Sequence, residues 1–257
     1  MFNWKEKVIL LTGASSGIGA GIALAVARQG ATLGLVARRK EMLDDLVAQC
    51  EEVGGTAIAF PIDVTDDAGL IAAADEMRER FGRIDILVAN AGVGGNDAET
   101  RAYTPQAVRR LVEINLLGAA NAVYAVVGDM ILRRSGHLVA VSSLAGYRGL
   151  PQSAAYSASK AGMSAFFESV RIDVQRSGVD VTIIHPGFIR TPLTSSRAAR
   201  MPFLMELEDA IPYFLRAIER KKRFAAFPWP LATLVRGGRL MPGWLYDRIA
   251  GRARFRE

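Results

Sequence analysis

The residues best suited to chemistry lie in one short stretch, from Ser143 to Lys160. Tyr156 and Lys160 are four residues apart on a segment, residues 153–175, that is predicted to form a single helix. Side chains at positions i and i+4 lie on the same face of a helix, so the phenol and the ammonium are expected to be neighbours. A nearby positive charge stabilises the phenolate and lowers the tyrosine pKa from its usual value of about 10. The pair is therefore suited to passing a proton to or from an alcohol oxygen near neutral pH.

Ser143 follows an apolar run, residues 137–141, that is predicted to be a strand. A strand ending there would deliver the serine hydroxyl to the same region, where it could polarise the oxygen that Tyr156 protonates. Many helices carry a tyrosine and a lysine at this spacing, so the alternative interpretation is a half-buried tyrosine beside a surface lysine. The rest of the chain decides between the two.

A glycine-rich turn lies near the start of the chain. Residues 7–11 form an apolar run, residues 12–19 read TGASSGIG, and an alanine-rich helical run continues to Gly30. Glycines let a backbone approach a pyrophosphate, and the start of a helix offers it free N–H groups and a partial positive charge. The spacing is not that of a Walker loop, because no Gly-Lys-Ser/Thr follows. The order of strand, turn and helix predicts a nucleotide site; the alternative is a turn needed only for packing.

The next predicted strand, residues 31–36, ends in a basic run. Ala37 stands where enzymes that prefer NAD carry an acidic residue, and Arg38 and Arg39 follow it. An arginine at this place accommodates the 2′-phosphate of NADP. The pattern favours NADP; the alternative is a solvated basic start to the predicted helix over residues 40–53.

Short apolar runs alternate with longer amphipathic ones along the rest of the chain. Further strands are predicted at residues 56–61, 85–89, 180–184 and 223–227, and further helices at residues 66–81, 105–117 and 118–134. This alternation predicts an α/β fold, a single doubly wound Rossmann domain over residues 1–257 with a mostly seven-stranded parallel sheet and helices on both faces. Ligands bind beyond the carboxyl ends of such strands. Six candidate site residues follow those ends: Thr12, Arg38, Asp63, Asn90, Ser143 and Pro186.

With these motifs, residues 7 to about 192 resemble the short-chain dehydrogenase/reductase family in its compact form. The elements that carry the resemblance, in order, are TGASSGIG at 12–19, Asp63-Val64, Asn90-Ala91-Gly92, Asn115, Ser143, Tyr156 with Lys160, and Pro186-Gly187 with Thr191. The resemblance implies that Tyr156 is the general acid in reduction and the base in oxidation. It implies that Lys160 holds the ribose of the nicotinamide, that Ser143 binds the carbonyl oxygen, and that Asn115 positions a water of a proton relay.

The resemblance also implies a nicotinamide cofactor, NADP(H) preferred and NAD(H) as the alternative. The expected cofactor-binding residues are Gly13, Ser15, Ser16, Gly17, Ile18, Gly19, Arg38, Arg39, Asp63, Val64, Asn90, Ala91, Gly92, Tyr156, Lys160, Pro186, Gly187, Ile189 and Thr191. The pair Ser15-Ser16 lacks the basic residue that many NADP-dependent members place in the turn, so the NADP prediction depends on Arg38.

Composition excludes several classes of protein. Half of the 257 residues are hydrophobic and 23% are charged, the balance of a soluble globular protein. The single cysteine, Cys50, fits a reducing cytoplasm and no disulfide framework. Two histidines, His137 and His185, with one cysteine predict no metal site, and no nucleic-acid-binding motif is present. The first residues do not read as a signal peptide, and no membrane-spanning run is predicted.

The substrate side is expected at residues 188–222, a predicted lid segment, together with the loop after Ser143. Their apolar residues are Phe188, Leu193, Met201, Phe203, Leu204, Met205 and Leu207, with Leu144, Tyr147 and Leu150 in the loop and Val93 nearby. An apolar lid favours a lipophilic substrate, steroid-, acyl- or aromatic-like, because burial of hydrocarbon is favourable. The alternative is that these residues only seal the core.

A basic, apolar extension is predicted over residues 228–257. Residues 216–257 hold eleven of the lysines and arginines against three acidic residues, and Gly237-Gly238 and Pro242-Gly243 are expected to break the segment into short helices. The favoured interpretation is packing over the cleft or against another subunit; the alternative is peripheral contact with an anionic membrane surface. The resemblance implies a homodimer or homotetramer built on residues 118–134 and 153–175.

Together these observations predict an NADP-preferring oxidoreductase that interconverts a carbonyl and a secondary alcohol on a lipophilic small molecule. One rival is a sensor or scaffold of the same fold that binds NADP without chemistry, and such proteins typically lack the tyrosine or the lysine. A nucleotide-sugar epimerase or dehydratase would need a larger substrate domain than this chain has room for.

Overall fold

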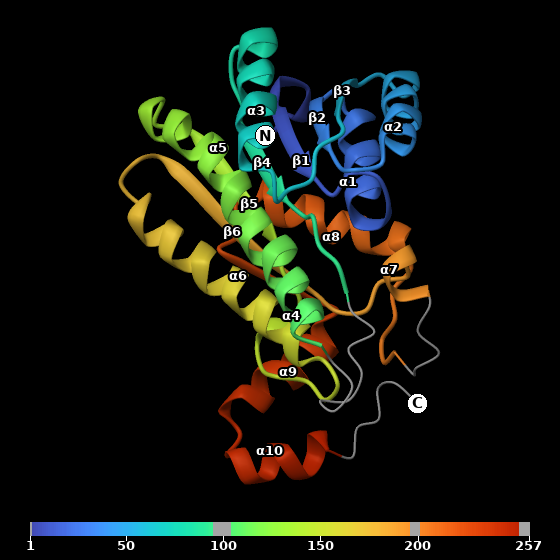
Figure 1. The fold of residues 1–257 in the computed structure, drawn as a ribbon, viewed down its shortest axis with the longest axis vertical. Coiled ribbons are helices and arrows are strands. Elements are labelled where there is room, and N and C mark those ends of the chain that lie inside the picture. Colours follow the sequence, from blue (N-terminus) through green and yellow to red (C-terminus); the bar gives the residue numbers. More distant parts are fainter. Residues whose placement is uncertain (1, 95–103, 196–200, 252–257) are drawn as a thin grey trace.

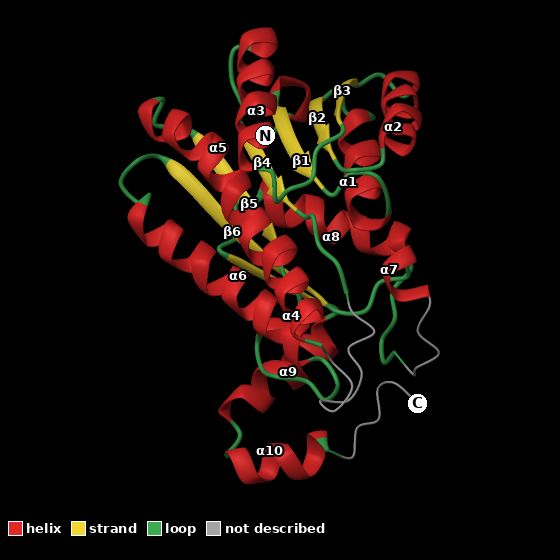
Figure 2. Ribbon diagram, viewed as in Figure 1, coloured by secondary structure: helices red, strands yellow, loops and turns green. Residues whose placement is uncertain are grey.

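The computed structural model describes residues 2–94, 104–195 and 201–251, and in these the predicted sheet is present. Seven parallel strands pair in the order β3-β2-β1-β4-β5-β6-β7 (Figure 2). Their bounds are β1 Val8–Thr12, β2 Thr32–Val36, β3 Thr56–Phe60, β4 Ile86–Ala89, β5 Gly136–Val141, β6 Val179–Pro186 and β7 Phe224–Phe227. The chain moves outward from β1 to β3 and then returns to β4 on the other side of β1. A crevice for a ligand opens where the order reverses in this way.

Ten helices connect or follow the described strands (Figure 1). They are α1 Gly17–Ala27, α2 Lys40–Glu52, α3 Asp67–Phe81, α4 Pro105–Val112, α5 Gly118–Leu132, α6 Ala154–Asp173, α7 Pro192–Ser195, α8 Leu207–Glu219, α9 Trp229–Leu240 and α10 Gly243–Ala250. A π-helical turn, Glu113–Leu117, joins α4 to α5, and a 3₁₀ turn, Leu144–Gly146, follows β5. The helices and strands predicted from periodicity are confirmed to within a few residues.

Helices cover both faces of the sheet, as predicted. Ile9 and Leu11 of β1 lie in one buried cluster with side chains of α1, α2 and α8. Leu10, between them, lies in a second cluster with side chains of α3, α5 and α6. Successive side chains of a strand point to opposite faces, so a strand buried on both sides reads as a continuous apolar run.

The expectation of no membrane-spanning run meets one candidate helix among the described residues. The helical run Pro105–Leu132 is long and apolar enough to cross a membrane by length and composition. In this fold Ala122 and Val126 are buried in the second cluster, and Asn115 and Asn121 donate hydrogen bonds to backbone or side-chain partners inside the protein. The run is apolar because one side of it covers the sheet, which identifies it as a core helix.

The segment 188–222 has two structural parts. Its first part leaves β6, forms a bridge between Ile189 and Met205, and includes α7. Its second part is α8, which packs on α1 and buries Phe214 and Ile218 in the core.

The C-terminal extension forms α9 and α10 after β7. The break at Pro242-Gly243 is confirmed, but Gly237 and Gly238 lie inside α9, so the break predicted there is wrong. A glycine inside a helix costs only about 1 kcal/mol, which the packing of Leu231 and Ala232 can offset. Arg252, Arg254 and Arg256 of the predicted tail lie outside the described residues.

Candidate active site

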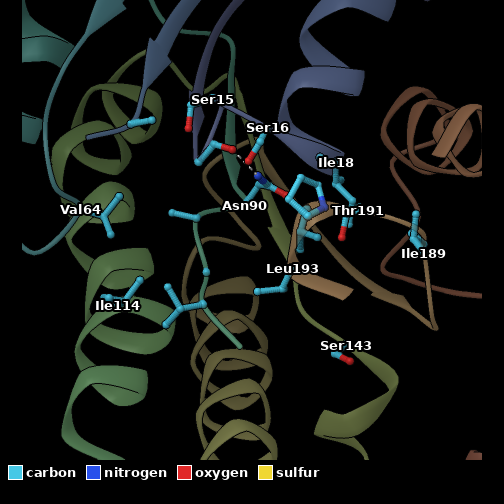
Figure 3. A pocket seen from close by; sticks show the side chains of 18 of the residues that line it. Ser15, Ser16, Ile18, Val64, Asn90, Ile114, Ser143, Ile189, Thr191 and Leu193 are labelled. Atoms are coloured by element: carbon cyan, nitrogen blue, oxygen red, sulfur yellow. Dashed lines mark hydrogen bonds between the residues drawn. The ribbon is translucent and has the colours of Figure 1, made fainter. Parts of the chain in front are cut away.

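One cleft lies at the carboxyl edge of the sheet and gathers the predicted site (Figure 3). Ser15 and Ser16 lie toward one end of the view and Ser143 toward the other. Among the predicted site residues, all line the cleft except Thr12, Gly19 and Asn115. Thr12 instead accepts hydrogen bonds from the N–H groups of Asn90 and Ala91. Residues that are far apart in the chain, from Gly13 to Thr194, therefore meet there.

The glycine turn is locked to the end of β4. Gly13 has φ +68°, and a Cβ added there would lie 2.6 Å from Cα of Ala91, so only glycine fits. The Asn90 side-chain amide donates to the carbonyl oxygens of Thr12 and Gly13, each at 3.1 Å. Gly19 packs against the Gly13 carbonyl, which explains why it supports the turn without lining the cleft.

The start of α1 is suited to an anion. Ser16 precedes the helix, its side chain does not cap the first turn, and that turn has no acidic residue. The backbone N–H groups and the positive end of the helix dipole therefore face the cleft uncompensated by the protein's own side chains. A pyrophosphate satisfies such groups, so the residues present fit a dinucleotide.

Arg39 supplies the positive charge that the glycine turn lacks. Its Nη2 donates to Oγ of Ser15 and Oγ of Ser16, both at 2.9 Å. Because neither Ser15 nor Ser16 is basic, the NADP prediction depends on Arg38 when only the sequence is considered. The guanidinium reaches that place from the end of β2, which a reading along the chain could not show.

Arg38 lies beside Asp63 on the same side of the cleft. Its Nη1 is 3.6 Å from Oδ2 of Asp63, and the two side chains are 57% and 35% exposed. The other carboxylate oxygen accepts from the N–H and the hydroxyl of Thr65, each at 3.0 Å. Asp63 is thus held in place, while most of the Arg38 guanidinium stays open to the cleft and solvent.

Tyr156 and Lys160 both line the cleft from α6, as the i, i+4 spacing predicts. Lys160 is only 4% exposed, so the alternative of a surface lysine is excluded. Its Nζ donates to the carbonyl oxygen of Val141 at 2.9 Å. Burial lowers the lysine pKa to about 8, because desolvation disfavours the ammonium. At pH 7 the group still carries its charge.

Ser143 caps the 3₁₀ turn after β5. Its Oγ accepts from the N–H of Ala145 at 3.1 Å. Because the oxygen acts there as an acceptor, the hydroxyl proton can still be donated to an oxygen in the cleft.

Asn115 is fully buried in the π-helical turn. Its Oδ1 accepts from the N–H of Val93 at 2.8 Å, and its Nδ2 donates to the Val93 carbonyl and to Oγ of Ser159, each at 3.0 Å. A Cβ added to Gly92 would lie 3.3 Å from both Asn115 Oδ1 and Lys160 Nζ. Asn115 therefore stands next to the lysine and holds the segment after β4, although it does not line the cleft. π-Helical turns inside helices often mark functional sites.

A buried polar network behind Lys160 was missed by the sequence analysis. Oγ of Ser142 and Oγ of Ser164 each donate to the Lys160 carbonyl, at 3.0 and 2.9 Å. His185 is hydrogen-bonded to Ser164 Oγ at 3.1 Å and to the Tyr147 hydroxyl at 3.4 Å. Burial, with the charges of Arg236 and Lys160, lowers the His185 pKa to about 4. The imidazole is therefore neutral, and its partners are fixed.

Other lining residues were missed although each lies within two positions of a predicted one: Ile62, Ile114, Val141, Ser142, Pro192 and Thr194. Their position directly beside a strand end or a motif was the available signal. Among the apolar residues expected on the substrate side, Val93 and Leu193 line the cleft. Leu144 instead packs under Leu231, and Met205 and Leu207 pack against the core.

A family model described as short chain dehydrogenase matches residues 7–202. An uncharacterized oxidoreductase of Myxococcus xanthus is 41% identical over 99% of this chain and 100% of its own length. The cis-4-hydroxycyclohexanecarboxylate dehydrogenase of Sinomonas cyclohexanicum is 33% identical over 90% of this chain and 93% of its own. The structure of a short-chain dehydrogenase from Sphingobium yanoikuyae in complex with NADPH is similar with a TM-score of 0.79, 29% identity and coverage of 91% and 95% of the two chains.

The match of the family model covers the strands and helices that build the cleft, from β1 to α7. The cleft itself unites a glycine turn suited to a dinucleotide with a tyrosine, a buried lysine and a serine. The chain therefore belongs to the short-chain dehydrogenase family and is an NAD(P)-dependent oxidoreductase.

Proposed function

We propose that this chain, acting as one domain, interconverts a carbonyl and a secondary alcohol on a lipophilic small molecule and prefers NADP(H). The observation that supports the reaction most is the common cleft of Tyr156, Lys160 and Ser143. A phenol, an ammonium and a hydroxyl are the groups needed to move a proton to or from one oxygen. The bound nicotinamide supplies or accepts the hydride.

Each of the four polar residues has a part in this proposal. In reduction Tyr156 donates its proton to the carbonyl oxygen, and Ser143 donates a hydrogen bond to the same oxygen. In oxidation Tyr156 accepts the proton of the alcohol. The charged Lys160 lowers the tyrosine pKa and holds ribose hydroxyls of the cofactor. Asn115 fixes the backbone beside Lys160 and positions a water next to it.

The decisive experiment replaces Tyr156 by phenylalanine, which removes the acid and keeps the ring. We expect turnover to fall by roughly 10²–10⁴-fold, the usual contribution of general acid–base catalysis, with the Kd for NADPH nearly unchanged. Tyr213→Phe is the matched control, since Tyr213 lies on α8 and does not line the cleft. Equal turnover of Tyr156→Phe and wild type would contradict the assignment. Binding of NADPH by wild type with no turnover on any substrate would favour the scaffold alternative.

The preference for NADP(H) is supported by the charges at the end of β2. Ala37 replaces the acidic residue that would accept from a ribose 2′-hydroxyl, and the guanidinium groups of Arg38 and Arg39 border the cleft there. Two positive charges at this place suit a 2′-phosphate, because arginine binds phosphate oxygens with charge-assisted hydrogen bonds.

A lipophilic substrate is supported by apolar side chains of the cleft. Val93, Ile114 and Leu193 line it. The related dehydrogenase from Sinomonas cyclohexanicum is named for a substrate with a hydroxyl on a hydrocarbon ring. We expect kcat/KM to rise along a series of cyclic ketones of increasing hydrocarbon area. A preference for small, highly charged ketones would contradict this part of the proposal.

We also propose a cytoplasmic homodimer or homotetramer. Tyr124 and Leu132 of α5 are 72% and 84% exposed, and Ile172 of α6 is 67% exposed. A second copy would remove these large apolar side chains from water. Light scattering of wild type and Leu132→Glu tests this, and a monomeric mass for wild type would contradict it.

The cytoplasmic location is inferred from Cys50, which is buried and forms no disulfide.

A further inference from the structure

The C-terminal helices are held against the catalytic loop by specific contacts. Nη1 of Arg148 donates to the carbonyl oxygens of Gly238 and Met241, and its guanidinium lies 3.8 Å from the ring centre of Tyr246. The Tyr246 hydroxyl donates to the carbonyl of Gly149. One side of α9 and one side of α10 are thus docked on the loop that follows Ser143.

The remaining surface of these two helices carries large apolar side chains that are exposed. Trp229 and Trp244 are 77% and 72% exposed, and Leu234 and Leu240 are 69% and 88% exposed. No residue of α10 is buried. Figure 1 shows α10 at one end of the long axis of the molecule, away from the sheet. We call this set of exposed side chains on α9 and α10 the terminal apolar face.

Positive charge accompanies the apolar residues. Arg239 on α9 and Arg248 on α10 are exposed, with Asp247 as the acidic neighbour. Trp244 and Arg248 are one turn apart, on the side of α10 opposite the docked Tyr246. Residues 216–257 as a whole hold eleven basic and three acidic residues. A partner for this face must therefore accept both tryptophan rings and arginines.

Two occupants have the required apolar character, a second copy of the chain and a lipid surface. A symmetric contact between two copies uses the same patch on each, so it would bring the arginines of both copies into one interface. Like charges at an interface cost free energy. An anionic bilayer instead accepts the rings at the headgroup level and attracts the arginines.

We propose that the terminal apolar face docks on an anionic phospholipid bilayer, with Trp229 and Trp244 in the interface and Arg239 and Arg248 at the phosphate groups. Docking in this way holds the loop after Ser143 close to the membrane surface. The inference goes beyond the proposed reaction and does not depend on which substrate is used.

The test is co-sedimentation of the full chain with vesicles of phosphatidylglycerol and phosphatidylcholine, and with vesicles of phosphatidylcholine alone. We expect the wild-type chain to bind the anionic vesicles, and we expect this binding to weaken in high salt. The partition coefficient of Trp244→Ser/Arg248→Ser should be at least tenfold lower. The matched control is Met42→Ser/Arg28→Ser, which removes an exposed apolar residue and an exposed arginine on α2 and at the end of α1. The control should bind as wild type does.

Two further readouts separate the outcomes. Turnover of a water-soluble substrate should be unchanged in Trp244→Ser/Arg248→Ser, which shows that the variant is folded. Equal partitioning of wild type and this variant, or equal binding to both kinds of vesicle, would overturn the proposal. A change in oligomeric mass in the variant, with no vesicle binding by wild type, would show that the face contacts a second copy and would overturn it as well.

Discussion

Nζ of Lys160 donates to the carbonyl oxygen of Val141 at 2.9 Å, which ties helix α6 to the end of β5. The lysine is 4% exposed, and its position beside Gly92 and Asn115 leaves it little freedom to move. Burial disfavours the charged ammonium of Lys160 and therefore lowers its pKa to about 8. A charged group poised close to neutral pH is suited to a site that moves protons.

The variant Lys160→Met tests how much free energy of unfolding is lost by burying the charged lysine, through the pH dependence of stability. In the unfolded chain the lysine keeps a pKa near 10.5, and in the folded chain it is about 8. Between these values the unfolded state binds more protons, so wild-type stability should rise with pH relative to the variant. The slope should approach about 1.4 kcal/mol per pH unit midway between the two pKa values and be smaller near each of them. Urea unfolding at pH 7, 8, 9 and 10 measures it. A difference that does not vary with pH would contradict a buried, charged lysine.

The lowered pKa of His185 predicts how the stability of the protein changes at acidic pH. Its pKa is lowered to about 4 from 6.5, so between these values the unfolded chain binds a proton that the folded chain does not. Wild type should lose stability as the pH falls from 6.5 toward 4, by up to about 1.4 kcal/mol per pH unit from this group. His185→Gln should show a smaller loss in urea unfolding at pH 6.5, 5.5 and 5. His137, whose pKa is also lowered to about 4 by burial, remains in the variant as an internal reference.

Arg38 and Arg39 should act together on cofactor choice. Arg38→Ser and Arg39→Ser are each expected to raise the KM for NADPH by roughly 10–100-fold, the value of a lost charge-assisted hydrogen bond, and to leave the KM for NADH nearly unchanged. Adding Ala37→Asp should turn the preference toward NADH. Lys40→Ser is the control, because Lys40 pairs with Asp44 and does not line the cleft. An NADPH/NADH ratio that is the same in all these variants would count against a 2′-phosphate site.

Asn115→Ala should reduce both stability and turnover. The change leaves the N–H and the carbonyl of the half-buried Val93 without their side-chain partners. An unsatisfied group costs about 1–3 kcal/mol when it is fully buried, so the loss of stability per group should fall below that range. Asn121→Ala, also on the long helical run, removes one hydrogen bond to the Val64 carbonyl and should cost less. Thermal unfolding and single-turnover rates report the two effects. Equal losses of stability and turnover in Asn115→Ala and Asn121→Ala would contradict a specific role of Asn115 beside Lys160.

The local part of the fold and of the site could be predicted from the sequence. Buried parallel strands read as continuous apolar runs, amphipathic helices repeat every 3.6 residues, and a glycine turn needs its glycines at fixed places. For the same reason, spacing alone predicted that Tyr156 and Lys160 share one face of a helix. Spacing alone also predicted that Ser143 lies at the edge of the sheet. These properties depend on neighbours within a few residues.

Contacts between distant segments depended on the tertiary structure. The guanidinium of Arg39 meets Ser15 and Ser16 only because β2 lies beside β1. The side chains of Ser164 and His185 meet behind Lys160 only because α6 packs on β6. The helix over Pro105–Leu132 is a core helix only because a sheet lies against it. The pattern of residues along short segments determined which side chains could react. The order in which the strands pair determined which of these side chains lie together, because that order brings groups far apart in the chain to one edge of the sheet.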